Sequence, residues 1–145
     1  MENFTMKFRV RYAETDQMGI AHHSNYFVWF EAGRSEYCRA LGLPYGEWEK
    51  EGVYMPVVEV QCRYKSPLRY DELATLEVLP PEIRSCTMTF RYRLLGEAGK
   101  LAAEGWTKHA FADAKGKLIR RENDFIRHLK ELAQTPPHTQ EEPLE

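Results

Sequence analysis

The sequence predicts a single α+β domain with five antiparallel strands and one long apolar helix. A sheet curved around the helix satisfies this pattern, as do other α+β packings. Five segments alternate apolar and polar residues, which is the period of a half-buried strand. Between residues 24 and 41 the apolar residues instead recur at steps of three and four, as on a helix. Short turns link the four strands that follow the helix, and this order is typical of an antiparallel sheet packed on a helix.

The first strand is expected over residues 4–12 and the central helix over residues 24–41. Ser24 is the expected N-cap of that helix, and Gly42 follows it where a left-handed residue commonly ends a helix. The helix has a wide apolar face, so it must be covered on several sides. Its expected solvent-facing strip is made of Glu31, Arg34, Glu36 and Arg39.

A loop is expected after the helix, followed by strands over residues 55–64, 73–79, 87–95 and 101–112. Residues 96–99, which contain two glycines, form the expected hairpin turn between the last two strands. A short C-terminal helix is expected behind Asn123, its N-cap. The domain should therefore span residues 1–133, and residues 134–145, with three prolines and three glutamates, should form a disordered tail.

Composition excludes several classes of protein. The net charge of −2 and the pI near 6.2 give no basic surface for nucleic acid or an anionic membrane. The sequence contains neither a signal-peptide pattern nor a stretch of about 20 apolar residues, so no membrane insertion is expected. The three cysteines, Cys38, Cys62 and Cys86, are far apart and suggest reduced thiols in the cytoplasm.

Residues 12–26, between the first strand and the helix, concentrate the reactive side chains. They end at a helix N-terminus, where unpaired N–H groups can stabilise a developing oxyanion. Asp16 can supply a carboxylate that attacks a carbonyl or deprotonates a water. Gly19 allows a positive φ or a close approach of the backbone to a substrate. Thioester hydrolysis needs little more than such a carboxylate and an oxyanion hole formed by backbone N–H groups.

Simpler interpretations exist for each of these residues. Asp16 can be a turn residue, as Asp in a Gly-containing loop often is, and Glu14 a solvated or salt-bridged carboxylate. His23 can be a loop histidine that bonds a neighbouring carbonyl. A metal site with His22 and His23 is not expected, because adjacent histidines diverge and no H-x-x-x-H or H-x-H spacing is present.

The pattern Tyr12-x-x-Thr15-Asp16-x-x-Gly19-x-x-x-His23-x-x-Tyr26, with Glu31 and Arg34 on the following helix, closely resembles a family signature. The family is that of the 4-hydroxybenzoyl-CoA thioesterases, and within it the acyl-CoA thioesterases of the YbgC/FadM type. Residues 67–73 also look like the turn into the family's third strand, so the resemblance covers about residues 4 to 119. It implies a hot-dog fold, active sites at dimer interfaces, and no metal or organic cofactor.

The resemblance also implies roles for individual residues. Asp16 matches the catalytic carboxylate, as nucleophile or general base, and the backbone N–H near His23 matches the oxyanion hole. His23 itself matches a histidine that lies near the thioester in YbgC-type members. The expected substrate-binding residues are Gly19, Ile20, His22 and Tyr26, and the expected CoA-binding residues are Lys65, Arg84 and Ser85.

The function implied is that of an acyl-CoA thioesterase acting as a homodimer or homotetramer. The acyl group stays open, as does the choice between CoA and acyl carrier protein. One alternative is a hot-dog hydratase or dehydratase, but those enzymes use a tighter D-x-x-x-x-H loop, whereas six residues separate Asp16 from His23 here. The other alternative is a non-catalytic acyl-CoA-binding protein.

Overall fold

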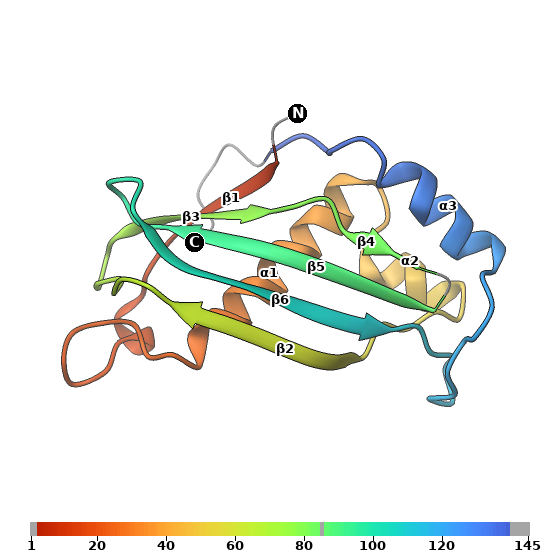
Figure 1. Cartoon of the computed structure of the whole chain (residues 1–145), viewed down its shortest axis with the longest axis horizontal. Helices are drawn as coiled ribbons and strands as arrows, with labels where there is room; N and C mark the ends of the chain where they lie inside the picture. Colours follow the sequence, from red (N-terminus) through yellow and green to blue (C-terminus); the bar gives the residue numbers. More distant parts are fainter. Residues whose placement is uncertain (1–2, 85, 140–145) are drawn as a thin grey trace.

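The computed structural model describes residues 3–84 and 86–139, and in them an antiparallel sheet of six strands curves around helix α1 (Figure 1). The predicted α+β architecture of the hot-dog type is confirmed. The elements in chain order are β1 (Phe4–Arg9), a 3₁₀ turn (Tyr12–Glu14), α1 (Asn25–Ala40), α2 (Tyr45–Lys50), β2 (Val57–Tyr64), β3 (Leu73–Val78), β4 (Glu82–Ile83), β5 (Thr87–Leu95), β6 (Leu101–Ala110) and α3 (Asp124–Leu132).

The strand order is β1-β3-β5-β6-β2, and the short β4 pairs with β5. Every pairing is antiparallel, and the longest runs from Thr87 opposite Ala110 to Leu95 opposite Leu101. The order leaves β1 and β2 as the two edges of the sheet. Helix α1 lies across one face of it (Figure 1).

The core forms between the buried face of the sheet, where every second residue points inward, and the buried face of α1, where residues recur at helical spacing. Strand β5 buries every second residue, and α1 buries a wide stripe that faces the sheet. Phe30 of α1 stacks on Tyr92 of β5 with ring centroids 4.3 Å apart. Gly33 allows close contact, because a Cβ there would come 2.4 Å from Leu76 Cδ2. The aromatic residues at the start of α1 therefore serve mainly as core.

Gly105 in β6 provides a test of this packing. A Cβ at this position would lie 2.2 Å from the carbonyl oxygen of Gln61, a backbone atom of the neighbouring strand that cannot turn aside. We expect Gly105→Ala to destabilise the domain by about 1–3 kcal/mol in urea unfolding. Gly46→Ala is the matched control, since nothing lies within 4 Å of its added Cβ. Equal losses in the two variants would contradict this account.

Several details differ from the sequence prediction. The prediction of five strands was wrong, because β4 adds a sixth that is only two residues long. Helix α2 occupies part of the expected loop, and its Trp48 is buried and donates to the carbonyl of Leu43 (2.9 Å). Arg34, expected on the solvent-facing strip, is also buried.

The helix ends follow the predictions in part. Gly42 has a φ of 87°, and the Asn123 side chain accepts a hydrogen bond from Ile126 N (2.8 Å), so both of these predicted ends are confirmed. Ser24 occupies the N-cap position, but its hydroxyl makes no capping bond and instead lies 2.8 Å from Nδ1 of His22. The prediction of its capping bond was wrong.

Strand β2 is exposed along almost its whole length. Helix α1 does not cover it, and no strand pairs with its outer edge in the described part of the chain. Its exposed apolar side chains are Val57, Val58, Val60 and Tyr64. An uncovered apolar edge of this kind is available for pairing with another chain.

The chain after α3 returns to the first strand. Helix α3 ends at Leu132, one residue before the predicted domain boundary. Thr5 N donates a hydrogen bond to the Thr139 hydroxyl (3.3 Å), so residues 134–139 of the expected tail reach β1. The rest of that tail, residues 140–145, lies outside the described residues, and its disorder stays a prediction. None of the described helices is long and apolar enough to cross a membrane.

Candidate active site

The loop between β1 and α1 folds into a tight turn at Asp16. Thr15 and Ala21 form an isolated bridge, and Asp16 N donates to the carbonyl of Ile20 (2.8 Å). Gly19 N donates back to the carbonyl of Asp16 (2.9 Å), with a φ of 79° at Gly19 that a side chain would disfavour. The positive φ expected at Gly19 is thus confirmed.

Glu14 anchors this loop to α1. Its carboxylate is buried and accepts hydrogen bonds from Arg11 N (2.7 Å) and from the indole N–H of Trp29 (2.9 Å). It also pairs with the guanidinium of Arg11 at 3.4 Å. Its carbonyl accepts from His22 N (2.8 Å) and from the side-chain amide of Asn25 (2.9 Å). Glu14 therefore has a structural role, as a carboxylate that is salt-bridged to Arg11. This is the simpler of the interpretations that the sequence allowed.

One carboxylate oxygen of Asp16 accepts a hydrogen bond from the loop, and the other is available to a substrate or a water. Its Oδ1 accepts a hydrogen bond from Met18 N (2.8 Å), so Asp16 does shape the turn. Among the described residues no donor bonds the other carboxylate oxygen. The turn thus fixes the side chain while leaving one oxygen for chemistry.

A cavity of about 380 Å³ opens beside Asp16. It brings together five of the predicted site residues, namely Asp16, Ile20, His23, Tyr26 and Lys65. The other residues around it are Ala21, Tyr64, Ser66 and Pro67. Gly19 and His22 belong to the same loop but do not line the cavity. Arg84 directly follows β4, an element at the other end of the sheet from this loop (Figure 1), and Ser85 lies outside the described residues.

A backbone donor directly before α1 makes no hydrogen bond within the described residues. Asn25 N and Tyr26 N donate to the carbonyls of His22 (3.1 Å) and His23 (3.3 Å), and Ser24 N donates to Nδ1 of His22 (3.2 Å). The N–H of His23 has no acceptor within the described residues. It is thus available at a helix N-terminus, where the macrodipole favours negative charge.

Tyr64 is a site residue that the sequence analysis missed. It stands at the end of β2, and its hydroxyl donates to the carbonyl of His23 (3.2 Å). Its ring meets that of Tyr26 edge-on, with centroids 4.8 Å apart. Desolvation, with Cys62 contributing, raises the pKa of Tyr64 to about 12, so its phenol stays protonated and remains a donor. The sequence signal that could have identified Tyr64 is its position directly before Lys65, a predicted site residue.

The two histidines lie side by side in this loop. The rings of His22 and His23 have centroids 4.2 Å apart, and both residues are exposed. The described residues include no cluster of three or more His, Cys, Asp or Glu that could hold a metal ion.

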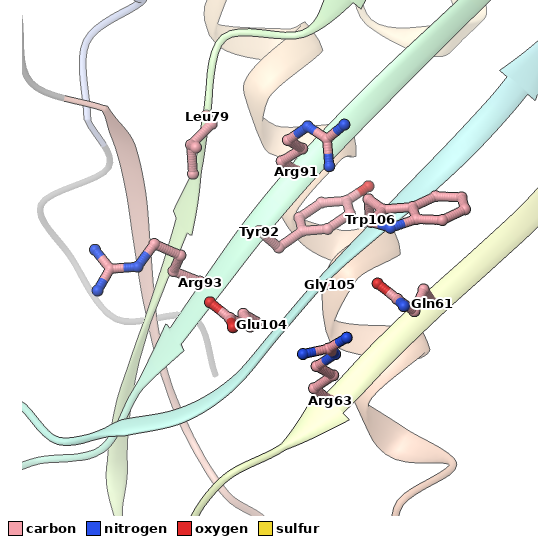
Figure 2. A pocket seen from close by; sticks show the side chains of 9 residues that line it. All are labelled: Gln61, Arg63, Leu79, Arg91, Tyr92, Arg93, Glu104, Gly105 and Trp106. Carbon is pink, nitrogen blue, oxygen red and sulfur yellow. The ribbon is translucent and has the colours of Figure 1, made fainter.

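A second hollow of about 300 Å³ lies on the outer face of the sheet (Figure 2). The register there places Arg63 opposite Glu104, Glu104 opposite Arg93, and Arg93 opposite Glu77. Opposite charges therefore alternate across four strands, and the pair Arg93–Glu77 closes to 3.3 Å. None of the predicted site residues lies in this hollow.

Comparison with known proteins identifies the family. A family model described as "Thioesterase superfamily" matches residues 18–103. The chain belongs to this superfamily. It is therefore a thioester hydrolase, and the YbgC-type resemblance is confirmed. The matched residues begin just after Asp16, so the assignment of that carboxylate rests on the geometry above.

Three relatives illustrate the match. A Bacillus subtilis (strain 168) protein named "Putative acyl-CoA thioesterase YneP" is 39% identical over 107 residues, covering 74% of this chain and 78% of its own. A DHNA-CoA thioesterase from Staphylococcus aureus superposes with a TM-score of 0.84 at 30% identity, covering 92% of this chain and 90% of its own. The hypothetical protein TT1821 from Thermus thermophilus gives a TM-score of 0.81 at 40% identity, covering 89% and 98%.

Proposed function

We propose that this enzyme hydrolyses an acyl-CoA thioester to a free carboxylic acid and CoA, with Asp16 as the catalytic carboxylate. The observation that carries the proposal is the single cavity in which Asp16 and His23 meet at the N-terminus of α1. There a carboxylate oxygen and a backbone N–H, neither of which has a hydrogen-bond partner among residues 3–84 and 86–139, lie on the same loop.

The chemistry follows from these two groups. The thioester carbonyl oxygen accepts the N–H of His23, which stabilises the negative charge that develops on it. Asp16 then either attacks the carbonyl carbon, giving an anhydride that water hydrolyses, or removes the proton of a water that attacks the same carbon. In both routes the C–S bond breaks and the sulfur leaves as the CoA thiolate.

The alternatives predict different products. A hydratase would add water to an enoyl-CoA without releasing thiol, and a binding protein would bind acyl-CoA without turnover. The family, whose named relatives include acyl-CoA thioesterases, favours hydrolysis over both. The test is an assay of thiol release from aryl, short-chain and long-chain acyl-CoAs, with acyl carrier protein thioesters as a second series. Tight binding without thiol release from any of them would refute the proposal.

We propose further that the active enzyme is a dimer formed through β2, or a tetramer built from such dimers. The exposed edge of β2 carries Val58 and Val60, and Tyr64 from the same strand lines the cavity. Pairing β2 with β2 of a second copy satisfies the free edge and covers these side chains.

The remaining assignments depend on this assembly. Lys65 lies at the cavity and suits the CoA phosphates. Arg84 and Ser85 keep their predicted role as CoA contacts, but Arg84 can serve a site only where another subunit adjoins it. We place the reaction in the cytoplasm, because Cys38, Cys62 and Cys86 are all free thiols.

His23 tests which group stabilises the oxyanion. We expect His23→Ala to lower kcat only about five- to fiftyfold, because the substitution keeps the backbone N–H that we assign as the donor. The measurement is steady-state thiol release compared with that of Asp16→Asn. Equal losses in the two variants, with a double variant no worse than either, would instead make the imidazole the base.

A further inference from the structure

The direction of one backbone N–H, that of His23, decides whether the proposed oxyanion donor can reach a thioester carbonyl. Such a donor must lie about 2.7–3.1 Å from the position that the oxyanion takes, and the bond weakens as its angle opens. His23 precedes α1, which begins at Asn25, so the regular hydrogen bonds of the helix do not orient this N–H. Other contacts must therefore hold it.

Two planar peptide units meet at the Cα of His23. The first carries the carbonyl of His22 together with the N–H of His23, and the second carries the carbonyl of His23. Because a trans peptide is planar, its C=O and N–H point in opposite directions, and fixing the carbonyl also fixes the N–H. Side chains that hold these two carbonyls therefore aim the proposed donor.

Asn25 holds the first of the two carbonyls with its side chain. Its Nδ2 donates to the carbonyl of His22 (3.2 Å) and to the carbonyl of Glu14 (2.9 Å). Both acceptors are carbonyl oxygens, so only the nitrogen end of the amide can face them. The backbone N–H of Asn25 donates to the carbonyl of His22 as well (3.1 Å). The side chain thereby ties this peptide to Glu14, whose buried carboxylate bonds the indole of Trp29.

Tyr64 holds the second carbonyl from β2. Its hydroxyl donates to the carbonyl of His23 (3.2 Å), and both residues line the Asp16 cavity. Because desolvation raises the pKa of Tyr64 to about 12, the hydroxyl keeps its proton and remains a donor at neutral pH. Tyr64 stands at the end of its strand, so this bond joins the sheet to the loop that carries the N–H.

We propose that Asn25 and Tyr64 are positioning residues, which hold the two peptide units at His23 so that its N–H points at the thioester carbonyl. The inference rests on the proposed function and deepens it, since it assigns residues that act on the reaction through His23. Neither positioning residue belongs to the signature that carries the family resemblance. One oxyanion donor typically contributes about a hundredfold to a thousandfold to kcat, and a donor that is kept but misaligned should lose part of this.

Asn25→Ala removes both side-chain donations and keeps the backbone bond to His22. We expect kcat to fall about ten- to fiftyfold and KM to change less than about threefold, because the N–H bonds the oxyanion more strongly than the neutral carbonyl of the bound substrate. Asn25→Asp should lose at least as much, since its oxygens cannot donate to either carbonyl. Asn123→Ala is the matched control. It removes a side-chain-to-backbone bond at the start of α3 and should lower thermal stability while kcat stays unchanged.

Tyr64→Phe keeps the ring that packs against Tyr26 and loses only the hydroxyl. We expect kcat to fall about three- to twentyfold, again with little change in KM. Tyr70→Phe is its matched control, because Tyr70 is also exposed and packs on Tyr12 with centroids 5.6 Å apart, but does not line the Asp16 cavity. Its hydroxyl makes no hydrogen bond within the described residues. This variant should keep full activity.

The carbonyl band of a bound analogue reports the direction of the N–H without turnover. The probes are S-phenacyl-CoA and S-(2-oxooctyl)-CoA, labelled with carbon-13 at the carbonyl. In both ketones a methylene group separates the carbonyl from the sulfur, so neither can be hydrolysed. A hydrogen bond from His23 N–H weakens the C=O bond and lowers its infrared stretching frequency. We expect this lowering in the wild type and in both control variants, and a smaller one in Asn25→Ala and Tyr64→Phe.

The two readouts separate this inference from the proposed function. Wild-type kcat in Asn25→Ala or in Tyr64→Phe, or a carbonyl band equal to that of the wild type, would overturn the positioning role of that residue while thioester hydrolysis stands. If the band is lowered in the wild type and relaxed in both variants, but no acyl-CoA releases thiol, the proposed function fails and the positioning of the His23 N–H holds.

Discussion

Asp16→Asn should lower kcat for acyl-CoA hydrolysis at least about a hundredfold while the protein remains folded and binds substrate. The amide oxygen of Asn can still accept the hydrogen bond from Met18 N, so the turn that holds residue 16 is preserved. Its nitrogen, which replaces the free carboxylate oxygen, can neither attack a carbonyl nor accept a proton. The measurement is steady-state thiol release on the best substrate of the acyl-CoA panel.

Asp113→Asn is the matched control for this variant. Asp113 shapes a turn in the same way, with its Oδ1 accepting from Lys115 N (2.9 Å) and Lys117 N (2.9 Å), but it does not line the Asp16 cavity. It should keep full activity with a comparable change in thermal stability. Retention of more than about a tenth of wild-type turnover by Asp16→Asn would show that another group activates the nucleophile.

Local patterns predicted most of the fold because they report on the face that each element buries. Strand β5 was placed correctly, since its alternation of buried and exposed residues is complete. Strand β4 and helix α2 were not predicted, because neither is long enough to show a repeating pattern of apolar residues. Trp48 instead holds α2 through rings distant in sequence, with Phe125 at 5.3 Å and Phe111 at 6.5 Å between centroids.

The candidate site was predictable as far as one segment builds it. Asp16 and His23 lie in one loop at a helix N-terminus, so their position suggested a carboxylate close to backbone donors, and the family resemblance then implied the role of each residue. Tyr64 and Ser66 come from the far end of β2, and their place depends on a packing that no local pattern encodes. The burial of Arg34 was missed for the same reason, because helical periodicity cannot show that its side chain bonds Tyr92 of β5.

Val60→Lys should separate the subunits and reduce hydrolysis at least about fiftyfold, because a lysine on a strand edge opposes pairing with another strand. Val60 lies near the middle of β2 and is 45% exposed in the single chain, so the charge should leave the fold of each subunit intact. Light scattering should then report a monomer where the wild type is a dimer or tetramer. Circular dichroism should be unchanged.

Val28→Lys separates an effect at the β2 edge from that of an added surface charge. Val28 is 54% exposed but borders the groove between α1 and β1, at the opposite edge of the sheet from β2. This variant should remain assembled and active. Tyr64 at the end of β2 lines the Asp16 cavity, and the proposed dimer pairs this strand, so a monomeric Val60→Lys enzyme should lose turnover even though its own Asp16 and His23 are untouched. A monomer with wild-type kcat/KM would show that one chain holds the whole site, and the β2 dimer would then have no role in catalysis.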